Sequence, residues 1–250
     1  AGHDINYIAM TGALHAIGDS ARMAQPLNLV GDGGGAMFLV AGVLAALHNR
    51  KQSGGTVVHA AIIDGAAALM GPFYEMLAIG AWEDRRGANI LDGGAPFYTT
   101  YSTRDGKAMA VGALEPHFFA ELLNGLELDA AELPDQYDRS TWPELRRMIG
   151  ARFATQTRDE WTAVFEDTDA CVTPVLSLSE APHHPHNVRR RVFGGSDEHR
   201  LPNPAPRVGD NPERALSEAL GPGADTTAVL TEHGLDADEI DSLLRQGAVA

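Results

Sequence analysis

Three titratable side chains, those of His3, Asp32 and Glu115, lie in sequence surroundings that suit acid–base chemistry. His3 stands in the segment AGHDINY, Asp32 precedes the glycine run 33–35, and Glu115 precedes Pro116. Two such groups on opposite faces of a carbon acid can take a proton from one face and return one to the other, provided that the intermediate anion is stabilised. Residue type alone does not choose among the three.

Each of these residues also has a plainer structural interpretation. His3 stands near the start of the sequence, where many chains fray. An aspartate before a helix is an ordinary N-cap, and the glycines after Asp32 suit a tight turn, although they would also let a ligand approach backbone N–H groups at a helix N-terminus. Glu115 before Pro116 suits the start of a helix, where the helix dipole favours a carboxylate.

The hydrophobic pattern predicts the elements that would position these residues. After a glycine-rich turn at 31–35, residues 36–51 predict a buried helix, because they are rich in alanine and leucine and lack proline. The β-branched segment 56–62 predicts a strand. Residues 64–82 predict a second helix, interrupted at Gly71-Pro72. The type of the apolar segment 5–17 stays open.

The second half of the sequence predicts a small α+β unit. Two strand-like segments, 97–103 and 107–114, are joined by Arg104-Asp105-Gly106, and Asp-Gly between such segments favours a hairpin. Helices are expected at 116–124, 142–156, 158–167 and 236–247, an extended segment at 171–178, and a surface connector at 182–212.

Composition narrows the classes of partner. The formal net charge of −15 over 250 residues disfavours binding to nucleic acid or to anionic membrane surfaces. No stretch is expected to be long and apolar enough to span a bilayer, and we expect a cytoplasmic protein without membrane association. The single cysteine, Cys171, has apolar neighbours that indicate an inert buried thiol.

A cluster of histidines and a run of arginines are two further candidate ligand-binding features. His183, His184 and His186 lie in a proline-rich connector without a matching carboxylate or cysteine pattern, so we expect solvated surface and no metal site. The run 189–191 of three arginines could meet phosphate, but a solvated charge run is the default interpretation.

Five blocks resemble, in order, the α-methylacyl-CoA racemases of the family III CoA-transferase superfamily. These blocks are AGHDINY (1–7), PLNLVGD with GGG (26–35), SGGTVVHAAIIDG (53–65), ALEPHFF (113–119) and DACVTPVLSLSEAPHHPHN (169–187). The resemblance implies a large α/β domain, incomplete at its N-terminus, and a smaller α+β domain in an interlocked homodimer. On this basis residues 1–90 belong to the large domain, 91–182 form the small domain, and 183–250 form a connector and a C-terminal segment that returns to the large domain.

The resemblance also implies an enzyme of lipid and fatty acid metabolism that epimerises 2-methylacyl-CoA thioesters through an enolate. His3, paired with Glu115, and Asp32 would act on opposite faces of the α-carbon, and no metal or redox cofactor is expected because CoA arrives with the substrate. The residues implied to bind substrate and CoA are Gly2, His3, Asp4, Ile5, Asn6, Tyr7, Gly33 and Gly34.

The sequence departs from the family pattern in one place near the candidate site. An aromatic residue that the family has between the aspartate and the glycines is missing here, so that Gly33 follows Asp32 directly. Two alternatives stay open. One is an acyl-CoA:carboxylate CoA-transferase in which Asp32 attacks the thioester as a nucleophile; the other is an inactive, truncated dimer scaffold.

Overall fold

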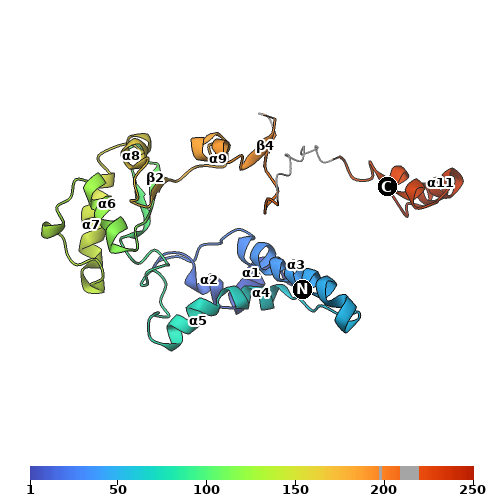
Figure 1. Cartoon of the computed structure of the whole chain (residues 1–250), viewed down its shortest axis with the longest axis horizontal. Coiled ribbons are helices and arrows are strands. Elements are labelled where there is room, and N and C mark those ends of the chain that lie inside the picture. Colours follow the sequence, from blue (N-terminus) through green and yellow to red (C-terminus); the bar gives the residue numbers. More distant parts are fainter. Residues whose placement is uncertain (197–198, 209–219) are drawn as a thin grey trace. The chain divides into compact units, whose positions relative to one another are not determined.

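The computed structural model describes residues 1–196, 199–208 and 220–250, whose helices and strands are shown in Figure 1. These residues divide into two units, Ala1–Val175 and Leu176–Ala250. The domain boundaries near 90 and 182 stay a prediction.

The first unit begins with helices. They are α1 (Asp4–Met10), α2 (Ala13–Ala16), the π-helix η1 (Leu29–Gly35), α3 (Ala36–Ser53), α4 (Ile62–Leu69) and α5 (Gly71–Ala78). Ile8, Ala13 and Ala66 form a small buried core among them, and η1 packs against both α1 and α4. Glycine permits the closest of these contacts, because a Cβ atom on Gly65 would lie 2.6 Å from the Cα of Gly35. The helix break predicted at Gly71-Pro72 is confirmed at Met70, between α4 and α5.

Two predictions for this region are wrong. Residues 31–35 do not form a turn, because the π-helix contains them and runs directly into α3. Residues 56–61 do not form a strand, and α4 begins at Ile62. β-branched side chains favour extended backbone, but a strand also needs a neighbouring strand to satisfy its N–H and C=O groups. Among the described residues no strand pairs with this segment.

Helix α3 is present as predicted, but its predicted burial is wrong. Its apolar side chains surround the helix axis, and many are exposed, with Leu44 at 61% and Met37 at 58%. A helix that is apolar on all sides is normally covered by protein or lipid. The described residues of this chain cover little of it.

One helical segment is long and apolar enough to cross a membrane by length and composition alone, contrary to expectation. It is Leu29–Gln52, 24 residues long, within which a stretch of 18 residues has a mean hydropathy of 1.7 and is 11% buried. The predicted turn at 31–35 would have divided this segment, whereas η1 and α3 are continuous. A single helix of this kind is weak support for membrane insertion, because the core helix of a water-soluble protein can have the same length and composition.

A three-stranded antiparallel sheet follows in the order β1-β2-β3, formed by Tyr98–Ser102, Ala108–Gly112 and Val172–Pro174. Thr100 pairs with Ala110 in the first pair of strands. The connection contains Gly106 at φ 75°, a conformation that glycine adopts without strain. The predicted hairpin is therefore confirmed.

The helices α6 (Pro116–Gly125), α7 (Trp142–Phe153) and α8 (Arg158–Phe165) complete the small α+β core. The 3-10 turns η2 (Ala130–Glu132) and η3 (Arg139–Thr141) connect α6 to α7. Trp161 is fully buried, packs edge to face on Phe153, and donates its indole N–H to the Phe153 carbonyl at 2.9 Å. The three helices confirm the predicted ones, with ends that differ by a few residues.

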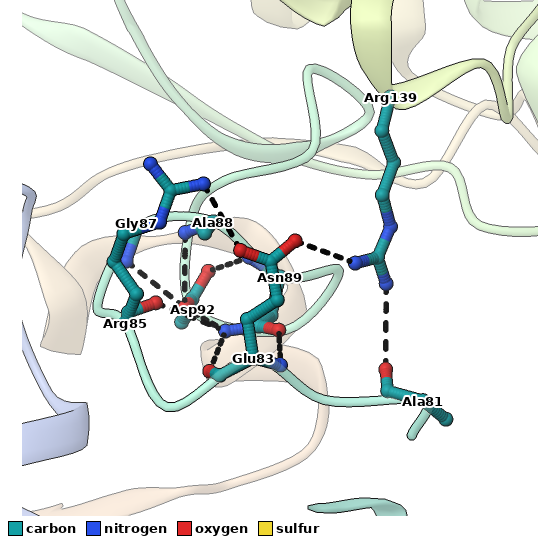
Figure 2. Close-up of polar contacts among 8 residues, drawn as sticks. All are labelled: Ala81, Glu83, Arg85, Gly87, Ala88, Asn89, Asp92 and Arg139. Carbon is teal, nitrogen blue, oxygen red and sulfur yellow. Dashed lines mark hydrogen bonds and ion pairs between the residues drawn. The ribbon is translucent and has the colours of Figure 1, made fainter.

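A polar loop joins this core to the N-terminal helices (Figure 2). Asn89 is fully buried; its Nδ2 donates to the carbonyls of Glu83 and Arg85 and to Asp92 Oδ2, and its Oδ1 accepts the Glu83 N–H at 2.8 Å. From η3, Arg139 donates to the Ala81 carbonyl at 3.3 Å and pairs with the Glu83 carboxylate at 3.4 Å. These contacts hold the loop in one conformation.

The second unit contains η4 (Ala181–His183), α9 (Pro185–Arg189), a two-stranded antiparallel sheet of β4 (Phe193–Gly195) and β5 (Arg200–Pro202), α10 (Thr226–Glu232) and α11 (Ala237–Arg245). The segment predicted as an irregular connector, 182–212, therefore has short regular elements, and its last residues lie outside the described ones. The predicted C-terminal helix is confirmed as α11.

Candidate active site

Asp32 lies within the π-helix η1. Helices of this type are rare in proteins, and those that occur are often found at functional sites. The Asp32 side chain is exposed, and its Oδ2 accepts a hydrogen bond from Asn28 Nδ2 at 2.7 Å. The plain N-cap interpretation of Asp32 is wrong, because the residue lies inside a helix. An accessible carboxylate held by an amide can act as a base, an acid or a nucleophile.

His3 is the N-cap residue of α1, and it is exposed. Its backbone is held on both sides of the residue: the N–H donates to Asn6 Oδ1 at 3.0 Å, and the carbonyl accepts the Asn6 N–H at 2.9 Å. The imidazole is therefore accessible on an ordered backbone, and the prediction of a frayed start does not apply to it.

Asp4 connects the segments that carry these two residues. Its side chain is 2% exposed, and its Oδ1 accepts the backbone N–H of Asp32 at 2.7 Å. Because Asp4 follows His3 directly, this bond ties the start of α1 to the middle of η1. The structure therefore brings the His3 and Asp32 segments together, as the candidate chemistry requires.

Glu115 is the N-cap residue of α6, with Pro116 at the first helical position, and it is exposed. Within the described residues of the chain, no hydrogen bond or ion pair joins it to His3. Cys171 is exposed rather than buried, which corrects the prediction. Partial burial raises the pKa of the Cys171 thiol, and the carboxylates of Glu115 and Asp169 raise it further. That thiol is a poor nucleophile, because the thiolate is the reactive form.

The other residues predicted to bind ligand lie around the same two helices. Ile5 is 43% exposed on α1, and a Cβ atom on Gly2 would lie 3.3 Å from the Tyr7 hydroxyl. Gly33 donates its N–H to the Asn28 carbonyl at 2.9 Å, so it is not a free donor for an anion. A Cβ atom on Gly34 would lie 2.6 Å from Leu69 Cδ1, so this glycine serves helix packing.

Sequence reasoning missed two contributors to the site. Asn28 lies four residues before Asp32, one helical turn away, but the predicted turn at 31–35 hid that relation. The hydrogen bond between the Asp32 N–H and the Asp4 carboxylate joins residues 28 apart in sequence, and a local sequence pattern cannot predict it.

An apolar cavity of about 540 Å³ lies beside η1. Its lining includes Leu29, Val30 and Gly34 of η1 together with Leu69. Phe73 and Trp82 also line it, and their rings meet edge to face at 5.1 Å. Cavities of this size and lining accept apolar groups of small ligands.

No cluster of three or more histidine, cysteine, aspartate or glutamate side chains able to hold a metal ion is found among the residues that the structure describes. His183, His184 and His186 lie around η4 and α9.

The model of CoA-transferase family III matches residues 1–226. The mouse protein named alpha-methylacyl-CoA racemase is 45% identical over 246 residues, covering 96% of this chain and 64% of its own length. The human protein of the same name is 43% identical over 248 residues, covering 97% of this chain and 65% of its own length. The chain thus spans just under two thirds of these relatives.

A solved structure supports the fold. The crystal structure of a CAIB/BAIF family protein from Brucella suis superimposes with a TM-score of 0.73 at 18% identity, covering 93% of this chain and 63% of that one. The predicted family fold, with mixed α and β structure, is therefore confirmed. From the match over residues 1–226 and the similarity to these relatives, the chain belongs to CoA-transferase family III.

Proposed function

We propose that this chain is part of an α-methylacyl-CoA racemase, an enzyme that inverts the carbon next to a CoA thioester. The observation that carries the proposal is the hydrogen bond from the Asp32 N–H to the Asp4 carboxylate, which ties the segment that carries the exposed His3 to the segment that carries the exposed Asp32. The 43% and 45% identity to proteins named alpha-methylacyl-CoA racemase supports it.

The proposed reaction replaces the proton on the α-carbon by two proton transfers, one on each face. Either His3 or Asp32 removes the α-proton, the C–H electron pair enters the enolate of the thioester, and the other residue returns a proton to the opposite face. After this step the base carries the proton and the acid has lost one, which is the state that converts the other enantiomer. Exchange of protons with water restores the first state, and no redox partner is consumed. We therefore propose that no metal or redox cofactor takes part, and that CoA is bound only as part of the substrate.

The apolar cavity beside η1 is the proposed site for the acyl chain. It adjoins the helix that carries Asp32, and most of its lining side chains are aliphatic or aromatic. An apolar cavity recognises a chain by burial rather than by hydrogen bonds, which suits substrates that share a reacting centre but differ in length.

Glu115 has a role in this proposal only if a second copy of the chain supplies it. Its carboxylate makes no contact with His3 in the described part of one chain. We propose a homodimer in which Glu115 of one subunit accepts a hydrogen bond from His3 of the other, which would fix the imidazole tautomer.

A CoA-transferase is the second candidate. The exposed Asp32 carboxylate favours it, because a nucleophile must reach the thioester carbonyl. A protein named succinyl-CoA–D-citramalate CoA-transferase from Chloroflexus aurantiacus is 28% identical over 194 residues. In this candidate Asp32 would attack the thioester carbonyl, the C–S bond would break with CoA leaving as the thiolate, and an acyl-enzyme anhydride would form, which gives the imidazole of His3 no evident task.

A chiral assay distinguishes the two candidates. A single enantiomer of a 2-methylacyl-CoA is incubated with the protein and the ratio of enantiomers is followed, while a parallel sample receives an isotopically labelled free acid. The racemase proposal predicts a ratio approaching one to one and no label in the thioester. Transfer of label from the free acid into the thioester, without inversion, would contradict the racemase proposal and support the CoA-transferase.

A further inference from the structure

The carboxylate of Asp4 is buried and is committed to a contact within the protein. Its side chain is 2% exposed, and its Oδ1 lies 2.7 Å from the Asp32 backbone nitrogen. A hydrogen bond to an ionised acceptor is shorter and stronger than one between neutral groups. Burying a carboxylate is costly unless hydrogen bonds compensate for the lost water. A residue that only needed to contact a ligand would not require this burial.

The neighbouring sequence makes room for this bond. A Cβ atom on Gly31 would lie 2.5 Å from Asp4 Oδ1 and 3.1 Å from Ile62 Cγ2. Any side chain at position 31 would therefore push the carboxylate away from the Asp32 N–H. Asp4 and Gly31 form a matched pair, in which one residue provides the acceptor and the other leaves the space that it occupies.

The bond connects the segments that carry the two candidate catalytic residues. On one side, Asp4 shares a peptide unit with His3, whose N–H and carbonyl are both bonded to Asn6. On the other side, it holds the backbone of Asp32, whose carboxylate is bonded to Asn28. A change at Asp4 would thus shift the Asp32 carboxylate relative to the imidazole without removing either group.

We infer that Asp4 is a positioning residue whose carboxylate sets the location of the Asp32 carboxylate relative to His3 and is not a ligand of CoA. The inference rests on the proposed racemase function and deepens it. The relevant property of Asp4 is an oxygen acceptor at Oδ1, so asparagine can replace it and alanine cannot.

The experiment compares Asp4→Ala and Asp4→Asn with Asp32→Ala in deuterium oxide. Exchange of the α-proton is followed by NMR for each enantiomer of a 2-methylacyl-CoA separately. A displacement of about 1 Å can lower a rate by about a hundredfold. Asp4→Ala should therefore lower racemisation by about a hundredfold and slow exchange from the same enantiomer that Asp32→Ala affects. Exchange from the other enantiomer, deprotonated by His3, should persist.

Asp4→Asn should retain most of the activity toward both enantiomers. The matched control is Asp64→Ala, which removes an exposed carboxylate from the first turn of α4 and should change neither exchange rate. Equal loss of both exchange rates in Asp4→Ala would indicate a merely structural role. Loss in Asp4→Asn as large as in Asp4→Ala would show that the charge matters, and either result overturns the inference.

Hydrogen exchange of the Asp32 backbone amide separates this inference from the proposed function. In the unsubstituted chain and in Asp4→Asn that amide should be protected, and in Asp4→Ala it should exchange with solvent. If the unsubstituted chain catalyses no α-proton exchange but this protection pattern holds, the racemase proposal fails and the positional role of Asp4 stands. An unprotected Asp32 amide in the unsubstituted chain contradicts the positional role.

Discussion

Substitution of Gly65 by alanine tests the contact that seats the Asp32 helix on α4. The added Cβ would lie 2.6 Å from both the Cα and the carbonyl oxygen of Gly35. Non-bonded carbon atoms prefer about 3.5 Å or more, so the two helices would have to separate by roughly 1 Å. The obstructing atoms belong to backbone, which cannot rotate aside as a side chain would.

Two opposing terms set the magnitude. Overpacking of this kind costs about 3 kcal/mol at the upper end of its usual range. Replacing glycine by alanine within a helix contributes about 1 kcal/mol in the opposite direction. The net prediction is a loss of about 2 kcal/mol, which corresponds to a fall in Tm of about 6 °C for a protein of this size.

Thermal unfolding followed by circular dichroism measures this change. The matched control is Gly150→Ala within α7, where an added Cβ would make only ordinary van der Waals contact, at 3.5 Å from the Tyr101 ring. The control should be at least as stable as the unsubstituted chain. If Gly65→Ala were stabilised to the same extent as Gly150→Ala, helix propensity alone would explain both, and the close packing of η1 on α4 would be refuted.

Three further predictions concern other parts of the structure. Asn89→Ala removes four hydrogen bonds from a buried amide and should destabilise the chain by about 3 kcal/mol in thermal unfolding, whereas Asn124→Ala, on the exposed side of α6, should have little effect. The Thr103 hydroxyl donates to the Asp105 carboxylate and holds the pKa of that carboxyl below its usual value of 3.8. The stability that this bond contributes is present above pH 3.8 and is lost as the pH falls through the lower pKa of the folded state. Asp105→Asn should therefore flatten the fall of Tm in acid, and an unchanged slope would contradict this. Random mixing of His3→Ala and Glu115→Ala subunits should restore about a quarter of the activity if each site combines residues of two subunits, and none if one subunit supplies both.

Local signals allowed much of the small α+β part to be predicted. The Asp105-Gly106 turn is encoded in adjacent residues, and the β1–β2 hairpin forms around it. Pro116 at the first position of α6 likewise marks the helix start within a few residues. Such elements need no information from distant segments, which is why their pattern was sufficient.

The predictions that failed depended on distant partners. Residues 56–61 have the composition of a strand, but composition does not reveal whether another strand lies beside them. The glycines 33–35 suit a turn equally well, and only the approach of Gly65 to Gly35 shows that they serve helix packing instead. His3 and Asp32 can be predicted as candidates from their residue types and sequence surroundings. The hydrogen bond from the Asp32 N–H to Asp4 cannot be predicted in this way, because it joins segments that are distant in sequence.

Exchange of the α-proton in deuterium oxide tests the central claim most directly. Both enantiomers of a 2-methylacyl-CoA are incubated with the unsubstituted chain, His3→Ala and Asp32→Ala, and incorporation of deuterium at the α-carbon is followed by NMR. Two-base racemisation predicts that the unsubstituted chain exchanges the α-proton of both enantiomers. Each variant should fail to invert the substrate, and His3→Ala should lose exchange from one enantiomer while Asp32→Ala loses it from the other. Absence of exchange by the folded, unsubstituted chain, or inversion that survives both substitutions, would contradict the assignment of His3 and Asp32.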